Sequence, residues 1–276
     1  MENIKLCPGC MRELPQNRIK DLGKDTARCP YCGFCPSEYQ QNPRCLPPDT
    51  ILAGKYLVGK VLGEGGFGIT YIGFDLNMKT RVAIKEYFPV ELVTRDTTRR
   101  TGSGDDAAGE GAASGSSAPG VSVSTSGGGS DRVISLSGEK SKTYQQGLKK
   151  YVDEARNVSQ FADIPGIVSV KDFFYENNTA YIVMEYIEGI SLKEYLKQKG
   201  GKLSEEESLA ILRPVLEALE KVHAAGIVHR DISPDNIMLT FAEKEKAEQA
   251  SASDTASTPA STAVYGNISA VKLIDF

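Results

Sequence analysis

Several features that would assign a chain to a broad class are missing from this sequence. Among its 276 residues, no run approaches the apolar length of a membrane-spanning helix, which is about 18 residues. Its first residues, Met1 to Lys5, lead into no apolar stretch of signal-peptide length. Positive charge is not in excess, since 32 Lys and Arg residues are outnumbered by 36 Asp and Glu residues. These absences leave no indication of a membrane segment, of secretion or of nucleic acid as the main partner.

Cysteine is also missing from most of the chain, because all six cysteines precede residue 46. A hydrophobic fraction of 40% and a charged fraction of 25% are those of an ordinary globular protein. With no sign of secretion, we expect a cytoplasmic chain, in which thiols stay reduced and disulfides are rare. The clustered cysteines are therefore interpreted as candidate metal ligands.

Four of these cysteines follow the pattern C-x2-C-x18-C-x2-C, formed by Cys7, Cys10, Cys29 and Cys32. This spacing is typical of a four-thiolate zinc site. Each C-x2-C turn places two sulfurs on one ion, and zinc prefers four tetrahedral ligands. A small segment with little core takes much of its folding free energy from such a metal. We therefore predict a zinc-ribbon-like segment over residues 1–46, which would mediate contacts or recognition.

Other interpretations of the cysteines remain open. Rubredoxin-like iron and a redox dithiol are the alternatives to structural zinc. Cys35 and Cys45 are surplus to a site with four ligands, and either could replace Cys32.

The rest of the chain divides by composition. Residues 51–96 alternate in the manner of strands, with glycine interruptions. Residues 97–142 consist mainly of Gly, Ser, Ala and Thr and predict a disordered insertion, because they have almost nothing to bury. Residues 241–264 predict a second insertion of the same kind. We therefore predict a second domain over residues 51–276 that contains both insertions.

Helical patterns lie between the two insertions. Residues 144–161 carry one apolar stripe at spacings of three and four, made by Leu148, Tyr151, Val152, Ala155 and Val158. Ser191 and Ser204 each precede a glutamate by three residues, which is the pattern of a capping box that opens a helix. The second of these helices carries Leu209, Leu212, Leu216, Leu219 and His223 along one face. Pro214 predicts a kink or a local break in it.

Two strands are predicted between the helices, at Ile167–Val170 and Ala180–Tyr186, around a turn at Asn177-Asn178. Upstream of them, Gly63, Gly65, Gly66 and Gly68 form a G-x-G-x-x-G motif, in which the backbone can approach phosphates closely. A dinucleotide-binding oxidoreductase uses the same letters, but its motif opens a helix. Here a strand-like run, Ile69–Ile72, follows the glycines, which favours a phosphate-covering hairpin.

Two charged positions complete a phosphate-handling set. Val82-Ala83-Ile84-Lys85 matches the strand of protein kinases whose lysine contacts the α- and β-phosphates of ATP. The candidate carboxylate partner of Lys85 is Glu154, on the helix predicted at 144–161. The run His229-Arg230-Asp231-Ile232-Ser233-Pro234-Asp235-Asn236 places a carboxylate five residues before an amide, the spacing of a kinase catalytic loop. Asp275-Phe276 follows it.

Together these motifs identify a resemblance. The chain is similar to bacterial serine/threonine protein kinases of the eukaryotic-like type, especially those with an N-terminal zinc ribbon and an Ile-Lys-Glu-Tyr-Phe-Pro stretch, present here at Ile84–Pro89. The resemblance covers residues 51–96, 144–240 and 268–276. It implies an α+β fold, with the ribbon followed by a two-lobed kinase domain. It also implies ATP and Mg²⁺ as cofactors, with the Ser and Thr hydroxyls of proteins as substrates.

The same resemblance assigns roles to individual residues. Asp231 would be the catalytic base, and Asn236 and Asp275 would be the magnesium ligands. The adenine would be held by Thr70, Ala83, Met184, Glu185, Ile187 and Met238. A hydrophobic spine would be formed by Val158, Val170, His229 and Phe276.

Two positions depart from the family pattern. Thr70 stands where valine is usual, a near-isosteric change. Ser233 stands where a lysine commonly contacts the γ-phosphate, and one such electrostatic donor can be worth ~3 kcal/mol.

The sequence stops after Asp275-Phe276, before the glycine that the family pattern places next. We therefore expect a complete first lobe, an incomplete second lobe and a longer parent protein, in whose C-terminal region a membrane anchor is conceivable. The alternative function is a catalytically inactive, kinase-like scaffold in which the zinc ribbon is an interaction module.

Overall fold

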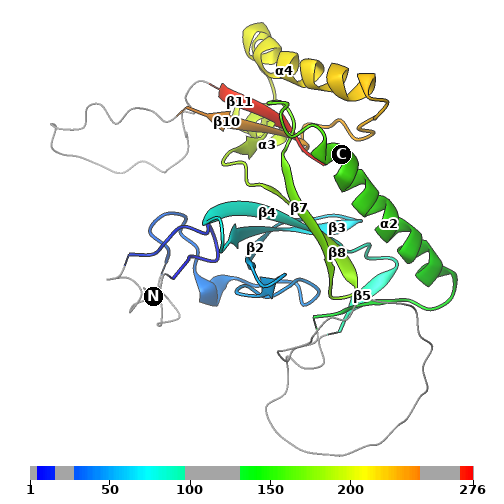
Figure 1. Ribbon diagram of the computed structural model, residues 1–276. Coiled ribbons are helices and arrows are strands. Elements are labelled where there is room, and N and C mark those ends of the chain that lie inside the picture. Colours follow the sequence, from blue (N-terminus) through cyan, green and yellow to red (C-terminus); the bar gives the residue numbers. More distant parts are fainter. Residues whose placement is uncertain (1–4, 16–27, 97–130, 243–267, 276) are drawn as a thin grey trace, which may run out of the picture.

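The computed structural model describes residues 5–15, 28–96, 131–242 and 268–275, and it confirms the predicted α+β class (Figure 1). The larger sheet has six antiparallel strands in the order β1-β2-β3-β4-β8-β7. Their bounds are Ile51–Leu52 for β1, Tyr56–Glu64 for β2, Gly68–Asp75 for β3, Thr80–Tyr87 for β4, Thr179–Glu185 for β8 and Val170–Glu176 for β7. This sheet forms the first lobe.

The hairpin around Asn177-Asn178 is confirmed, because β7 and β8 pair on either side of it and both asparagines have positive φ. The strand predicted at Ile167–Val170 is wrong, since β7 begins only at Val170. Ile167 instead forms a single parallel bridge with Leu273 and is fully buried beside Val222. The apolar run that begins at Ile167 is therefore a packing site for Val222 and Leu273, which come much later in the chain, and not a strand.

Helix α2 spans Glu139–Ser159, so it begins five residues before the predicted helix. Residues 139–143 of its first turn are polar, so the spacing of apolar residues does not reveal that the helix begins there. The buried stripe is Tyr144, Leu148, Val152, Ala155 and Val158. Just before α2, the short strand β6 (Val133–Ser135) pairs with β5 (Val93–Arg95). The predicted end of the first insertion at residue 142 is therefore corrected, whereas residues 97–130 lie outside the described residues.

The described residues from 190 onward form the second lobe, which contains a three-stranded sheet and two helices (Figure 1). The sheet order is β11-β10-β9, with β11 at Ile268–Leu273, β10 at Ile237–Phe241 and β9 at Ile190–Ser191. Helix α3 spans Leu192–Gln198 and α4 spans Glu205–Ala224. Most of the predicted second insertion, from residue 243 onward, lies outside the described residues.

Both predicted helix starts are confirmed. Ser204 and Glu207 form a complete capping box, and the side chain of Ser191 accepts a hydrogen bond from the Glu194 backbone N–H. Helix α4 continues through Pro214 without the expected break.

The leucine stripe that the sequence places on one face of α4 is not the face that the helix buries. Its buried residues are Ile211, Val215, Ala218 and Val222, while Leu209, Leu212 and Leu216 are exposed. The helix carries two apolar stripes of similar period, and the spacing alone does not choose between them.

The main core lies between the six-stranded sheet and α2, where Tyr71, Tyr144 and Tyr181 are among the largest fully buried side chains. Cys45 and Leu46, at the end of the predicted ribbon segment, are part of this same core. A second core fills the space between α3, α4 and the three-stranded sheet. Within the described ranges, no helix combines the length and apolar character needed to cross a membrane.

The N-terminal segment packs directly on strand β2. The Lys60 backbone N–H donates to the Pro8 carbonyl at 2.8 Å. A side chain at Gly59 would collide with Met11 and with the Pro8 carbonyl, so glycine is required by this close approach. The cysteine-bearing segment is therefore docked on the first lobe.

Candidate active site

A cavity of about 850 Å³ opens between the six-stranded sheet and the second lobe. Its volume lies within the usual range for sites that take small molecules and cofactors. The walls come from the β2–β3 turn, β4, β8, α2 and the loop that precedes β10. Eleven of the residues predicted for catalysis, nucleotide binding or magnesium binding line it: Gly63, Gly65, Gly66, Gly68, Thr70, Lys85, Glu154, Met184, Asp231, Asn236 and Asp275.

Three of the remaining predicted adenine contacts, Ala83, Glu185 and Ile187, adjoin Met184 of this lining. Ala83 and Ile187 pack with Met184 in one apolar cluster that also contains Val170. The side chain of Glu185 accepts a hydrogen bond from the Ser169 backbone at 2.8 Å and pairs with Lys272. Met238 lies in β10 opposite Ser191 and is not among the residues that line the cavity.

The predicted spine is only partly described. Val158, Val170 and His229 line the cavity, whereas Phe276 lies outside the described residues.

The glycine-rich turn is held by backbone hydrogen bonds. The Gly65 N–H donates to the Gly68 carbonyl at 2.9 Å, and the Phe67 carbonyl accepts from Phe88 at 3.0 Å. A Cβ at Gly68 would lie 2.5 Å from the Glu86 carbonyl, a separation that real side chains do not adopt. The turn therefore depends on glycine where it crosses the end of β4. It joins two strands, which excludes the strand–turn–helix of a dinucleotide-binding fold.

Lys85 forms its ion pair with Asp275, with Nζ 3.0 Å from Oδ1. The ion pair expected with Glu154 is not formed in the described structure. Glu154 lines the same cavity, where partial burial raises its pKa although the charges of Lys85 and Arg230 act in the opposite direction. The raised pKa indicates that burial outweighs the attraction of this carboxylate to the two cations.

Asp231 and Asn236 are joined by hydrogen bonds. Asn236 donates from Nδ2 to Oδ2 of Asp231 at 2.9 Å and to the Asp231 carbonyl at 3.0 Å. With both N–H groups directed at Asp231, the amide oxygen of Asn236 remains as an acceptor or metal ligand. The five-residue spacing therefore has a local cause, because it lets the two side chains meet across one loop.

The same loop is tied to the segment that carries Asp275. The His229 ring nitrogen Nε2 lies 2.9 Å from the Ile274 carbonyl, and the Ile274 N–H donates to the Asn236 carbonyl at 2.9 Å. Burial lowers the pKa of His229, which favours the neutral ring. Arg230 and Asp275 both have positive φ, a backbone state that is uncommon outside glycine and tends to cluster at functional sites.

Helix α2 is held against β4 by aromatic side chains. The Tyr151 hydroxyl donates to the Lys85 carbonyl at 2.9 Å, and its ring lies 5.1 Å from that of Tyr87. Tyr87 also stacks on Tyr144 at 5.5 Å. The Tyr87 hydroxyl abuts Gly147 so closely that no Cβ fits there. These contacts set the distance between the helix that carries Glu154 and the strand that carries Lys85.

A buried charge network beside Lys85 was missed from the sequence. Glu86 and Arg95 form an ion pair at 2.6 Å with both side chains fully buried. The hydroxyls of Tyr71 and Tyr181 donate to the same carboxylate at 2.9 and 2.7 Å. The available signal was a glutamate directly before the aromatic pair Tyr87-Phe88, since a charge buried among apolar side chains requires a partner. The network fixes the strand that presents Lys85.

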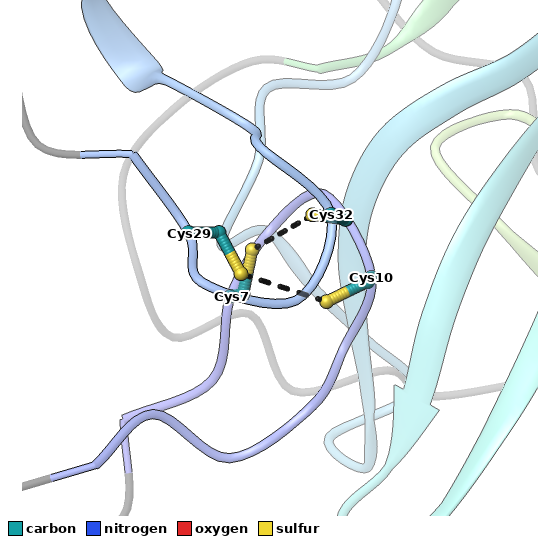
Figure 2. Close-up of side chains that lie close together, drawn as sticks. All are labelled: Cys7, Cys10, Cys29 and Cys32. Atoms are coloured by element: carbon teal, nitrogen blue, oxygen red, sulfur yellow. Dashed lines mark hydrogen bonds between the residues drawn. The ribbon is translucent and has the colours of Figure 1, made fainter. Parts of the chain in front are cut away.

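The four predicted metal ligands come together in the N-terminal segment (Figure 2). Their sulfur atoms all lie within 4.8 Å of one another, with Cys7 and Cys32 3.7 Å apart and Cys10 and Cys29 3.9 Å apart. Tetrahedral ligation at a zinc–sulfur distance of ~2.3 Å requires sulfurs ~3.8 Å apart. The donor set and its spacing therefore fit zinc.

The two surplus cysteines lie outside this cluster. Cys35 lies near Ser37, with Sγ 3.2 Å from the Ser37 hydroxyl, and Cys45 is buried in the main core. Cys32, rather than either of them, completes the set of four sulfurs.

Comparison with known proteins agrees with this geometry. Residues 130–276, slightly more than half of the chain, match the family model described as "Protein kinase domain". A solved structure titled "PpkA-294 apo form" matches with a TM-score of 0.55 and 29% sequence identity, over 71% of this chain and 57% of that chain.

Curated relatives are bacterial kinases. Serine/threonine-protein kinase PknG of Mycobacterium leprae is 30% identical over 87% of this chain and 26% of its own length. Serine/threonine-protein kinase F of Synechocystis is 28% identical over 94% of this chain and 44% of its own length. PrkC of Bacillus subtilis is 41% identical over 33% of this chain and 14% of its own length. The chain thus spans less than half the length of these relatives.

The family match, the kinase-like fold and the cavity that gathers the expected motifs lead to one conclusion: this chain belongs to the protein kinase family.

Proposed function

We propose that this chain carries the ATP-binding and phosphoryl-transfer machinery of a kinase that acts on Ser and Thr hydroxyls of proteins. One observation carries the proposal. Lys85, the Asp231–Asn236 loop and Asp275 are far apart in the sequence and line a single cavity. Those four groups are the ones that phosphoryl transfer requires for phosphate binding, proton acceptance and metal binding.

The adenine is proposed to bind beside β8, where Ala83, Met184 and Ile187 provide an apolar surface. Backbone groups of Glu185 and Ile187 would face its polar edge, and Thr70 would contact the ring from β3. Met238 is proposed as the adenine contact from β10. The turn that contains Gly65 and Gly66 would cover the phosphates, and Lys85 would contact them with a compact positive charge.

Asp231 is proposed to accept the proton of the substrate hydroxyl. Its carboxylate is oriented by the amide of Asn236, and the loop is held by the bond between His229 and the Ile274 carbonyl. A base fixed in this way needs little rearrangement when a hydroxyl enters the cavity. Asp231 and its supporting residues therefore account for positioning as well as proton transfer.

The residues that would hold Mg²⁺ are Asn236 and Asp275. Amide and carboxylate oxygens are the hard ligands that this ion prefers, and its charge would neutralise phosphate oxygens. Asp275 currently accepts from Lys85 through Oδ1, which leaves its second oxygen as a ligand.

Serine and threonine are the proposed acceptors because Pro234-Asp235-Asn236 resembles the catalytic loop of that kinase class. The curated relatives described above are named serine/threonine-protein kinases. Ser233 supplies no cation for the γ-phosphate, so the proposal assigns more of the charge stabilisation to Lys85 and the metal.

For the N-terminal segment, we propose structural zinc on Cys7, Cys10, Cys29 and Cys32. Four thiolates leave no open coordination position, which is typical of structural rather than catalytic zinc. The metal would hold the two cysteine turns together beside β2.

A catalytically inactive scaffold is the second candidate function. Ser233 and the pairing of Lys85 with Asp275 rather than Glu154 favour it. Two measurements separate the hypotheses, namely MgATP binding by titration and phosphate transfer to a mixed Ser/Thr peptide pool. Transfer by the chain that Asp231→Asn reduces by at least ~100-fold supports the kinase. Binding without transfer supports the scaffold, whereas transfer that Asp231→Asn leaves unaffected contradicts the proposed role of Asp231.

A further inference from the structure

The cysteine-bearing segment contacts Glu188, which lies in the connection between β8 and β9. Arg12, two residues after Cys10, donates to Oε1 of Glu188 at 2.5 Å. Arg81 of β4 donates to Oε2 of the same carboxylate at 2.6 Å. One side chain thus joins the N-terminal segment, the six-stranded sheet and the connection that leaves it.

Glu188 lies next to one of the proposed adenine contacts. It lies in residues 186–189, which link the end of β8 to β9, and it directly follows Ile187 of the apolar cluster. On its other side, Gly189 passes so close to the Leu239 carbonyl that a side chain would not fit. The connection is therefore pressed against β10 at one residue and held by two arginines at the residue before it.

Both arginines are themselves restrained. The Arg12 guanidinium lies 5.6 Å from the ring centre of Tyr31, which stands between Cys29 and Cys32. The Arg81 guanidinium lies 5.3 Å from the ring centre of Tyr186. An arginine already stacked on an aromatic ring loses less freedom when it binds a carboxylate.

The carboxyl group of Glu188 is ionised at neutral pH. Hydrogen bonding from Arg81, with a further contribution from Arg12, lowers its pKa to about 2. Both ion pairs are partly exposed to solvent, with side-chain exposures of 44% for Arg12, 27% for Arg81 and 55% for Glu188. Their individual effect is therefore modest, as is usual for solvated pairs.

We propose that Arg12 is a positioning residue for the nucleotide subsite, acting through Glu188 to hold residues 186–189 in the conformation that faces the adenine. This inference rests on the proposed function and adds a contribution from outside the kinase lobes. A connection held in its binding conformation pays less ordering cost when ligand arrives. The N-terminal segment thereby affects nucleotide affinity without touching the nucleotide.

The test uses four variants of the full chain: Arg12→Gln, Arg12→Lys, Glu188→Gln and the Arg12→Gln/Glu188→Gln double variant. Arg28→Gln is the matched control, because Arg28 pairs with Glu38 at 2.6 Å within the same N-terminal segment but away from residues 186–189. Adenosine and MgATP affinities are measured by titration. Amide hydrogen exchange of peptides that cover residues 185–190 is measured on the free protein.

Arg12→Gln is expected to lower the affinities for adenosine and for MgATP by the same factor, roughly two- to fivefold. Both ligands share the adenine subsite, so both should be affected equally. The substitution should also speed exchange in residues 185–190. Combining it with Glu188→Gln should add nothing beyond Glu188→Gln alone, and Arg12→Lys should restore part of the affinity. Arg28→Gln should change neither measurement.

Unchanged affinity and exchange in Arg12→Gln would overturn the inference. So would an equal effect of Arg28→Gln, which would indicate general loosening of the N-terminal segment. Additive effects in the double variant would exclude action through Glu188. If the unmodified chain binds neither adenosine nor MgATP, the proposed function fails, and the exchange measurement alone decides whether Arg12 holds the connection.

Discussion

Lys85 and Asp275 form an ion pair of 3.0 Å across the cavity, between β4 and the segment after β11. Glu154, the expected partner of Lys85, lines the same cavity from α2 without pairing to it. The two proposed phosphate- and metal-binding groups thus neutralise each other in this state. We predict that bound nucleotide and metal would compete with this ion pair, because phosphates would attract Lys85 and the metal would attract Asp275.

Glu154→Gln should stabilise the protein at neutral pH. Partial burial raises the pKa of Glu154 above its usual 4.5. The folded state then binds more protons than the unfolded state between those two pKa values, so stability falls as pH rises through that interval. Above it, the ionised carboxylate costs stability, and the amide removes this cost. Thermal unfolding should show a higher melting temperature for the variant at about pH 7 and a vanishing difference below about pH 4.5.

Asp153→Asn is the matched control for that measurement, because Asp153 is adjacent and pairs with Arg156 on the helix surface at 3.0 Å. Its melting temperature should stay near that of the unmodified protein across the pH range. A destabilised Glu154→Gln at neutral pH would show that attraction from Lys85 and Arg230 outweighs burial.

Lys85→Met should separate phosphate binding from adenine binding. The ammonium group is proposed to contact phosphates only, so MgATP affinity should fall by roughly 10- to 100-fold, as for a lost charged hydrogen bond. Adenosine affinity should not change. Isothermal titration with both ligands tests this, with Lys149→Met on the exposed face of α2 as the control. An equal loss for adenosine would place Lys85 outside the phosphate subsite.

The buried pair of Glu86 and Arg95 should be a large contributor to stability. Glu86→Gln leaves the Arg95 guanidinium buried without its counter-charge, which typically costs about 3–5 kcal/mol. Urea unfolding of Glu86→Gln, of Arg95→Met and of the Glu86→Gln/Arg95→Met double variant measures these costs. The double variant should lose less than the sum of the two single variants, because removing both charges leaves neither unpaired. Additive losses would mean that the two residues act independently.

The sequence predicted this site better than it predicted the elements around it. Its motifs are local, so the Asp231–Asn236 spacing and the C-x2-C turns identified residues that lie together in the structure without knowledge of the fold. The leucines of α4 and the run at Ile167 failed because apolar periodicity does not say which stripe finds a partner. The contact between Arg12 and Glu188 had no sequence signal, since it joins two exposed charges that are 176 positions apart.

Zinc binding gives the most direct test of the N-terminal segment. The purified chain should contain one zinc ion by elemental analysis, because the four sulfurs already lie near the separations of a tetrahedral site. Cys10→Ser removes one of four ligands and should lose most of the metal. Cys35→Ser is the matched control, as Cys35 is buried in the same segment but lies outside the sulfur cluster.

Retention of zinc by Cys10→Ser together with its loss from Cys35→Ser would reassign the ligands. Iron in place of zinc, recognised by its visible absorption, would favour the rubredoxin-like alternative. The zinc-depleted variant should also reproduce the nucleotide affinity of Arg12→Gln, because Tyr31 and Arg12 are both positioned by the cysteine turns. A normal affinity without zinc would show that these turns hold Arg12 in place unaided.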